Sequence, residues 1–274
     1  MTPSQRKIKT FANTLAIILV VFIFVSVATV TFLLSGGISL TNFIFGEAPA
    51  TEFSQTYENV ESLEVDLNYS ELKIATGDSF TVHATNIDAV KVIFEDNTLH
   101  IEDVSNLVDS IKNNNIIIVY LPAETVLKSC KLDSDLANIT VDSIVCEKFK
   151  LDLENGTGFI NYVEATESAK IETGTGAFTI NSAQLCNLSL ETGVGAVTIN
   201  SNLTGNAKIE TGLGKLDLLL SGSIVDYTIN GKAGAGNFIV ADNEVNGEFN
   251  FEGGSDMIAI TGGIGAVNIS FANP

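Results

Sequence analysis

From Glu47 onward, apolar and polar residues alternate along the chain with the period of a β-strand rather than that of a helix. Segments such as SLEVDLNYSELKIATG, DSFTVHATN and NNNIIIVYLP follow this pattern, are rich in β-branched residues and are bounded by Asn, Asp or Gly. Alternation places successive side chains on opposite faces of a strand, so that one face can be buried while the other is solvated. The pattern predicts an all-β domain built from short strands.

Beyond Leu132 the alternation becomes a sequence repeat. The stretches IETGTGAFTI, LETGVGAVTI and IETGLGKLDL follow one another at intervals of about 19 residues. We take the second glycine of each Gly-x-Gly pair as the anchor of a repeat. The anchors are then Gly158, Gly176, Gly195, Gly214 and Gly236, with Ala137 and Asp256 at the equivalent positions before and after them.

Apolar side chains recur at fixed distances from these anchors, as Ile171, Phe178 and Ile180 do around Gly176. One short repeat cannot bury its own apolar face, but stacked repeats bury columns of equivalent side chains and pair their backbones with the neighbours above and below. The sequence therefore predicts a parallel β-helix, or β-solenoid, of roughly 19-residue coils with a glycine at each tight corner. We expect the final stretch, ITGGIGAVNISF, to close the stack as a hairpin or cap.

The N-terminal part of the chain has a different pattern. Phe11–Leu34 contains no charged residue and is long enough to cross a bilayer as one α-helix. The basic stretch RKIK precedes it, so the positive-inside rule places the N-terminus in the cytoplasm and the C-terminal part outside. The apolar run is longer than that of a signal peptide and no clear cleavage site follows it. We predict an uncleaved anchor in contact with membrane lipid, with cleavage after about Ser35 as the alternative.

These patterns divide the chain into four parts. The expected bounds are 1–10 for a cytoplasmic tail, 11–34 for the transmembrane helix, 35–50 for a juxtamembrane linker and 51–274 for an extracytoplasmic domain. That domain comprises an N-terminal strand segment, 51–131, and the repeats with their C-terminal cap, 132–274. The expected location is the cytoplasmic membrane, crossed once, with the C-terminal domain extracellular.

Charge and cysteine content narrow the classes of function. The chain has 33 acidic and 14 basic residues and a formal net charge of −19. Such a surface repels phosphate backbones, which excludes nucleic acid as a partner. The cysteines Cys130, Cys146 and Cys186 match neither a disulfide framework nor a zinc motif. We expect them to be buried as small hydrophobic residues, with one disulfide as the alternative.

Catalytic motifs are weak in this sequence. A dinucleotide-binding fingerprint has three glycines that open a helix, whereas β-branched alternating residues follow the Gly-x-Gly pairs here. His83 and His100 stand alone in strand patterns and neither lies near a distinctive nucleophile. Paired carboxylates could hydrolyse a polysaccharide, but there is no Trp and only five Tyr to stack on sugars. We predict a protein that is not an enzyme and has no cofactor, with a polysaccharide-acting enzyme as a third alternative.

An acidic residue stands four positions before almost every anchor. The repeat places in this column Asp133, Glu154, Glu172, Glu191, Glu210 and Glu252, with Lys232 as the one basic residue and Asp66 at the same offset in the early strands. Neighbours in a solenoid column lie about 4.8 Å apart, where like charges repel unless lysines or a cation neutralise them. One hypothesis is a weak Ca²⁺ or Mg²⁺ site along the column. The other is a solvated face that is neutralised in part by Lys170, Lys208 and Lys215.

The apolar N-terminal segment, the strand ending in VYLP and repeats such as IETGTGAFTINSAQLCNLSL carry a family resemblance. Over about Glu47–Pro274 the chain resembles the putative-adhesin β-strand-repeat family of bacterial membrane-anchored proteins, whose function is unknown. The resemblance implies an adhesin-like binding or display module at the cell envelope, with a cell-wall polymer or a membrane protein as partner. Some relatives belong to envelope-stress operons, which implies an accessory or regulatory membrane protein as the alternative. The family offers no catalytic residues.

Overall fold

The computed structural model describes residues 51–106 and 115–272. They belong to one compact unit, Ala50–Pro274, in which the strands form a single 16-stranded sheet. The all-β prediction is therefore confirmed. The predicted transmembrane segment Phe11–Leu34 lies outside the described residues, and in the part of the chain that is described no helix is both long and apolar enough to cross a membrane.

Extended segments make up nearly all of the described chain. The strands are β1 (Phe53–Tyr57), β2 (Ser62–Leu67), β3 (Glu71–Gly77), β4 (Phe80–Ala84), β5 (Val90–Glu95), β6 (Thr98–Asp103), β7 (Ile116–Pro122), β8 (Leu127–Cys186), β9 (Leu188–Thr204), β10 (Asn206–Leu220), β11 (Tyr227–Lys232), β12 (Phe238–Val240), β13 (Asn243–Glu244), β14 (Glu248–Phe251), β15 (Asp256–Thr261) and β16 (Ile264–Phe271). Two 3₁₀ helices, η1 (Ile87–Ala89) and η2 (Ile224–Asp226), interrupt them.

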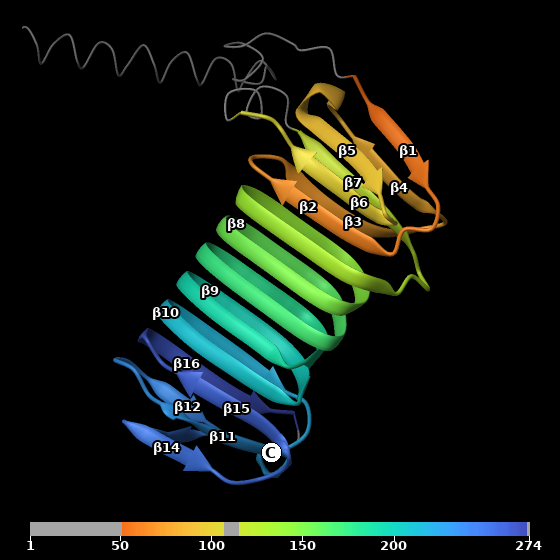
Figure 1. Cartoon of the computed structure of the whole chain (residues 1–274). Coiled ribbons are helices and arrows are strands. Elements are labelled where there is room, and N and C mark those ends of the chain that lie inside the picture. Colours follow the sequence, from red (N-terminus) through yellow and green to blue (C-terminus); the bar gives the residue numbers. More distant parts are fainter. Residues whose placement is uncertain (1–50, 107–114, 273–274) are drawn as a thin grey trace, which may run out of the picture. The chain divides into compact units, whose positions relative to one another are not determined.

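The segments β8, β9 and β10 wind in successive turns that stack on one another (Figure 1). Glu172 of β8 pairs in parallel with Glu191 of β9, which pairs in parallel with Glu210 of β10. The spacing between these partners equals the sequence repeat, so equivalent residues of successive turns lie directly over one another. We call each turn a rung. This parallel pairing is the arrangement expected of a β-solenoid.

Glycine occupies the corner of a rung because the backbones of neighbouring rungs meet there. Gly176, Gly195 and Gly214 have φ values of +143°, +147° and +151°. A Cβ atom added to Gly195 would lie 1.8 Å from the carbonyl oxygen of Gly176 in the neighbouring rung. The backbone conformation and the lack of space both exclude a side chain, as the repeat predicts.

One rung is in a different register from the predicted one. The corner next to Gly176 is Gly156 rather than Gly158, since a Cβ on Gly176 would lie 1.8 Å from the carbonyl oxygen of Gly156. Gly158 is buried, and an added Cβ there would lie 2.6 Å from Cδ2 of Phe178. The second glycine of this pair therefore makes room for an aromatic ring, and the predicted repeat is shifted by two residues in this rung.

A continuous hydrophobic core fills the inside of the stack. The residues five positions before each corner form one of its columns, which runs through Leu132, Leu151, Ile171, Leu190 and Ile209, each at most 1% exposed. Complete burial of such a side chain contributes about 1.5–3 kcal/mol before the cost of ordering the chain. Because one rung contributes only a few of these side chains, the stability of each rung depends on its neighbours.

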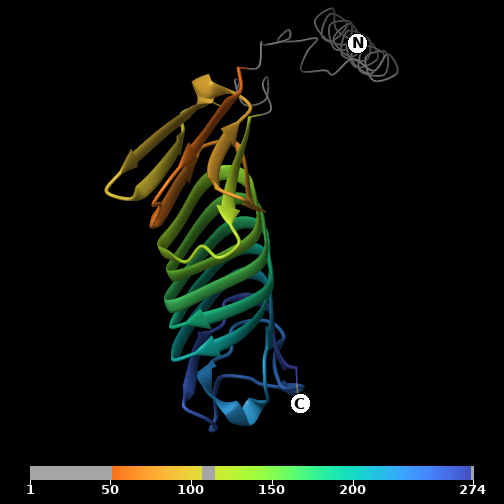
Figure 2. The same ribbon diagram turned by 90° about the vertical axis from the view of Figure 1, so that its right-hand side faces the viewer.

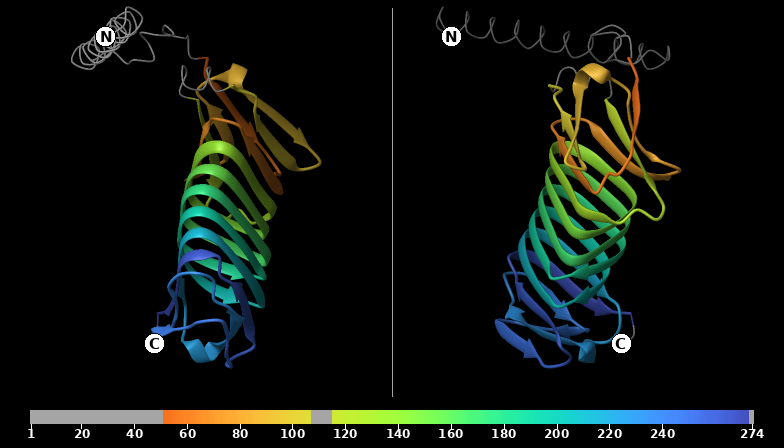
Figure 3. Two further views of the ribbon diagram at one scale, coloured as in Figure 1. Left: turned by 90° about the vertical axis from the view of Figure 1, so that its left-hand side faces the viewer. Right: turned by 45° about the vertical axis from the view of Figure 1, so that its right-hand side comes forward.

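The order of rungs in the stack differs from their order in the sequence at both ends (Figure 1, Figure 3). The last two strands, β15 and β16, pair with β10 on one side and with β11 and β12 on the other. At the other end, β2 and β3 lie between β8 and the strands β6 and β7. The stretch predicted to be a terminal cap is therefore an interior rung. Its corner is Gly265, which pairs with Gly214, so the predicted anchor Asp256 is wrong.

Antiparallel strands cover the outermost rungs at both ends (Figure 2). At the N-terminal end β4 pairs with β7 and β5 pairs with β6, and β1 extends the sheet beyond β4. At the C-terminal end β14 pairs with β11 and β13 pairs with β12. An uncovered parallel rung would offer its backbone edge to another chain, and the reversal of strand direction ends the repeat.

Candidate functional site

An acidic column runs along an outer face of the stack. In stack order it consists of Glu102, Asp66, Asp133, Asp152, Glu172, Glu191 and Glu210. Beyond Glu210 the same position is occupied by Thr261 and then by Lys232. We call these acidic residues the acid column. Burial raises the pKa of the Asp66 carboxyl, and the charge of the neighbouring Asp133 adds to this rise.

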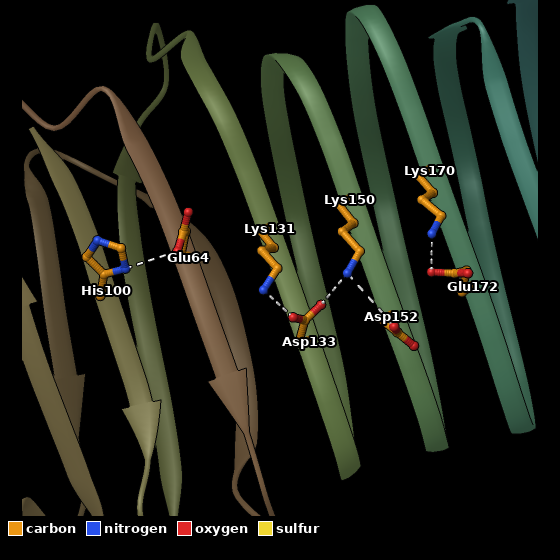
Figure 4. Close-up of polar contacts among 8 residues, drawn as sticks. All are labelled: Glu64, His100, Lys131, Asp133, Lys150, Asp152, Lys170 and Glu172. Atoms are coloured by element: carbon orange, nitrogen blue, oxygen red, sulfur yellow. Dashed lines mark hydrogen bonds and ion pairs between the residues drawn. The ribbon is translucent and has the colours of Figure 1, made fainter.

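Two predicted members do not belong to the acid column. Glu154 is displaced by the two-residue shift of its rung, and Asp152 takes its position (Figure 4). Glu252 lies between β14 and β15, and Thr261 pairs with Glu210 instead. The error at Glu252 arises because the sequence order of the last rungs is not their order in the stack. The predicted members that the structure does place in the column are Asp133, Glu172, Glu191 and Glu210.

Four acids of the column have a lysine two positions before them on the same rung, and these lysines are Lys131, Lys150, Lys170 and Lys208. Lys150 bridges two rungs, with its Nζ 3.3 Å from Oδ1 of Asp133 and 3.9 Å from Oδ2 of Asp152 (Figure 4). The predicted pairing of Lys170 is confirmed by a distance of 2.7 Å from its Nζ to Oε2 of Glu172. These lysines therefore neutralise part of the repulsion between stacked carboxylates.

The other two predicted lysines also form ion pairs. Nζ of Lys208 lies 2.6 Å from Oε1 of Glu210 in the acid column, whereas Lys215 pairs with Asp217 outside the column. Among residues 51–106 and 115–272, no group of three or more His, Cys, Asp or Glu side chains is arranged to hold a metal ion. The cation hypothesis stays a prediction.

The cysteines and His100 are placed as ordinary strand residues. Cys130 and Cys146 are buried, Cys186 is half-buried, and all three are free thiols. Burial raises the pKa of the Cys146 thiol to about 12, so the reactive thiolate is scarce at neutral pH. His100 lies on the surface with its Nδ1 3.0 Å from Oε2 of Glu64. The prediction of buried, unpaired cysteines is confirmed for two of the three.

A polar groove with a volume of about 460 Å³ opens on the side of the stack near its C-terminal rungs. We call it the lateral groove. Its lining includes Tyr162, Gln184, Asn202, Asp226, Tyr227 and Asp256. These residues come from β8, β9, η2, β11 and β15, so the lateral groove exists only when the regular rungs and the C-terminal rungs are assembled.

The lateral groove forms where one part of the coil stops repeating. β10 pairs with β9 only as far as Leu220 and Ser201, and the chain then leaves the stack through η2. Asn202, Leu203 and Thr204 pair with β8 on one side but have no pairing with β10 on the other. The lateral groove lies where a longer β10 would pair with these residues of β9.

Side chains satisfy backbone groups along this edge of β9. Oδ1 of Asp256 accepts a hydrogen bond from the N–H of Gly205 at 2.8 Å. The hydroxyl of Tyr227 donates to the carbonyl oxygen of Ser221 at 2.9 Å. Burial raises the pKa of the Tyr227 phenol, and a hydrogen bond from the backbone N–H of Leu203 opposes the rise. The edge is therefore closed by the Asp256 side chain and by single backbone bonds from Ser221 and Met257 rather than by a fully paired strand.

A second hydrogen-bonded group forms another part of the wall. The Tyr162 hydroxyl donates to Oε2 of Glu164 at 2.7 Å and accepts from Nε2 of Gln184 at 3.0 Å. The side-chain amide of Asn202 makes no hydrogen bond to any other described residue and is half-buried. The lateral groove thus combines fixed polar groups with an amide that has its donors and acceptor available, an arrangement suited to binding.

Sequence comparison assigns the chain to a family. The sequence profile described as Toastrack DUF4097 matches residues 35–249, which is well over half of the chain. The chain belongs to the Toastrack DUF4097 family. The profile spans the predicted linker, the N-terminal rungs, all of β8, β9 and β10, and the strands up to β14. The resemblance drawn from the repeats is thereby confirmed. No curated protein matches the sequence.

Several solved structures are similar to this Toastrack chain at low identity. A putative adhesin from Bacteroides fragilis is 15% identical with a TM-score of 0.42, covering 80% of this chain and 97% of its own. A putative cell adhesion protein from Clostridium sporogenes is 16% identical with a TM-score of 0.34, covering 81% and 99%. A putative lipid binding protein from Parabacteroides distasonis is 13% identical with a TM-score of 0.34, covering 83% and 97%. None of these three names describes an enzyme.

Proposed function

We propose that this protein is an adhesin-like binding or display module at the cell envelope, held in the cytoplasmic membrane by Phe11–Leu34 and without catalytic activity. The observation that carries the proposal is the lateral groove, a polar recess built on a stack that has backbone pairing along its length and a capped edge at each end. Groups held on such a frame lose little conformational freedom when they bind a ligand. Membership of the Toastrack family, whose similar solved structures include named adhesins, supports a binding role.

The alternative is an accessory or regulatory membrane protein that senses the envelope and acts through a partner. In that role the protein would act on a second membrane component that transmits the signal. A third reading, a polysaccharide-acting enzyme, requires paired carboxylates on either side of a sugar bond. In the lateral groove the carboxylates of Asp226 and Asp256 each accept a backbone N–H, which favours a structural use.

Cross-linking and co-purification of the full-length chain from its own membrane distinguishes these three proposed functions. We expect an envelope polymer to be recovered with the protein, and its chain length to be unchanged after incubation with the purified protein. Recovery of a membrane sensor protein without polymer would show that the regulatory reading is correct. Shortening of the polymer would show that the protein is an enzyme.

A further inference from the structure

We propose that the lateral groove is the ligand site of this module and that its ligand is an uncharged, hydroxyl-rich saccharide. This inference rests on the proposed binding function and names the ligand class and the residues for it. Three properties carry it: the charge of the groove's lining, the state of the β9 edge beside the groove, and the polar groups that remain available.

The charge of the lining excludes anionic ligands. Asp226 and Asp256 both line the lateral groove, and its described lining includes no Lys, Arg or His. The chain as a whole carries a net charge of −19, which adds to the repulsion of any anion. Phosphorylated, sulfated and uronic-acid ligands are therefore disfavoured. A neutral ligand and a cationic one remain.

The lateral groove includes Asn202, which lies on the unpaired edge of β9, and sheet edges often bind a peptide as an added strand. An added strand needs free backbone N–H and C=O groups along the edge. Here the N–H of Gly205 is bonded to Asp256, the carbonyl oxygen of Gly205 to the N–H of Met257, and the carbonyl oxygen of Ser201 to the N–H of Ser221. A peptide strand would have to displace these bonds, so recognition through side chains is favoured.

The available polar groups suit a saccharide. The Asn202 amide can donate and accept at once, which is the pattern that neighbouring sugar hydroxyls require. The half-exposed Tyr162 ring offers an apolar surface for the C–H face of a sugar. Tyr162 is already held in place by Glu164 and Gln184, so little side-chain freedom is lost on binding. The volume of about 460 Å³ lies within the range of small-ligand sites.

A cationic ligand is the remaining competitor. The carboxylates that would attract a cation are engaged, since Oδ2 of Asp226 accepts the N–H of Ser223 at 2.8 Å and Oδ1 of Asp256 accepts that of Gly205 at 2.8 Å. A carboxylate that caps a backbone group is held by that contact. The second oxygen of each carboxylate is still able to contact a cation. The neutral ligand is favoured instead by the Asn202 amide, which matches sugar hydroxyls, and a polyamine serves as the probe for the alternative.

The test is binding by the full chain, purified in a detergent that has no sugar headgroup, to an array of neutral oligosaccharides. Sulfated and uronic-acid oligosaccharides and spermidine serve as comparison probes. The groove variants are Asn202→Ala and Gln184→Ala. The matched control is Gln55→Ala, which removes an exposed amide from β1 at the other end of the stack. Thermal melting of every variant confirms that the fold is retained.

We expect at least one neutral oligosaccharide to bind and the acidic probes not to bind. Each groove variant should weaken binding of the neutral oligosaccharide between about threefold and tenfold, because one hydrogen bond is lost. Gln55→Ala should bind like the unmodified chain. Preferential binding of spermidine, or neutral binding that both groove variants retain in full, would overturn the assignment. If envelope polymer still co-purifies with the groove variants, the proposed function stands and the lateral groove is not its site. If no envelope polymer co-purifies with the unmodified chain, both the proposed binding function and the assignment of the lateral groove are wrong.

Discussion

Single glycines decide how closely neighbouring rungs can approach. Gly195 combines a φ of +147° with a carbonyl oxygen only 1.8 Å from the position of a Cβ atom. Gly247 also has a positive φ, +70°, but nothing lies within 4 Å of its Cβ position. The two positions therefore separate the cost of backbone conformation from the cost of crowding between rungs.

Replacing these two glycines with alanine should have unequal effects. Gly195→Ala is expected to lower the free energy of unfolding by about 3 kcal/mol or more, because backbone strain and a clash with the next rung add together. Gly247→Ala should cost only about 1 kcal/mol, the usual cost of a left-handed conformation. Denaturant unfolding of both variants measures the difference. Equal losses would show that the corner is not a close contact between rungs.

The sequence predicted these corners correctly where the glycine of the repeat has a single role. The pattern around Gly176, Gly195 and Gly214 gave the right corner because apolar residues flank it at the same distances in each rung. It failed at Gly158, where a glycine serves a different purpose. The space that the Phe178 ring needs is a contact between two rungs, and no periodicity within one rung reveals it.

The charges of single residues also affect stability, and the pKa values of Asp66 and Glu61 are shifted in opposite directions. Burial raises the folded-state pKa of Asp66 above its ordinary 3.8, so ionised Asp66 destabilises the fold at neutral pH and this penalty disappears as pH falls below 3.8. A hydrogen bond from Lys128 lowers the folded-state pKa of Glu61 below its ordinary 4.5. Glu61 therefore stabilises the fold above 4.5 and loses this effect as pH falls through the folded-state value.

Two amide variants give the corresponding measurement. Asp66→Asn should raise the melting temperature slightly at about pH 7 and leave it unchanged at about pH 3. Glu61→Gln should lower the melting temperature slightly at about pH 7, with the effect fading toward about pH 3. Both effects should be small because the groups are largely exposed. Shifts of the same sign at neutral pH would contradict this assignment of charges.

At the scale of elements, the lysines beside the acid column explain how parallel rungs tolerate stacked carboxylates. Lys150 contacts acids on two successive rungs, and lysines on other rungs contact the acid two positions further along. Because these contacts already provide positive charge, the stack does not require a bound cation. Because the lysines lie at the surface, each pair alone contributes little to stability, and their effect lies in the column as a whole.

Removal of divalent cations should therefore leave stability unchanged. We expect the same melting temperature in EDTA and in millimolar Ca²⁺ or Mg²⁺, because lysines neutralise the acid column. A clear rise in melting temperature with Ca²⁺ would revive the cation hypothesis for Asp133, Glu172, Glu191 and Glu210.

The position of β15 in the stack gives a sharper test at this scale. Ala259 lies in β15, paired on both sides with Lys208 and Asn230, while Asn250 lies in the outermost strand β14 and is paired with Asn230. Both side chains are exposed. Ala259→Pro should cost about 3 kcal/mol or more by breaking an interior ladder, and Asn250→Pro should cost clearly less. Denaturant unfolding measures the stability of both variants. Equal losses would mean that the rung containing β15 is not interior.

The sequence showed that rungs exist but not where each one lies. Its period identifies which residues of a rung face inward, since this depends only on strand alternation and neighbouring repeats. The insertion of β15 and β16 beside β10 depends on pairing across the intervening strands β11 to β14, which leaves no local pattern. The lateral groove did leave a signal: after Gly195 the repeat continues with Asn200 and Ser201, whereas the Gly214 rung has Leu219 and Leu220 and then a Ser-Gly-Ser turn.

At the scale of the whole molecule, a predicted membrane anchor precedes a stack that is covered by antiparallel strands at both ends. Antiparallel strands at each end prevent edge-to-edge growth, and the acidic surface opposes self-association. We therefore expect the full chain in detergent to remain monomeric over a wide range of concentrations, measured by light scattering. Concentration-dependent filaments would show that an end of the stack is open.

The most direct test of the binding account is site-specific photo-cross-linking in intact cells. A photoreactive residue is placed at Gln184 in the lateral groove, and in a second strain at Gln55 on β1, in the full-length protein. If the lateral groove binds a saccharide, the Gln184 position cross-links to a saccharide-bearing envelope polymer and the Gln55 position does not. Cross-linking of both positions to the same membrane protein, with no saccharide at Gln184, would contradict it.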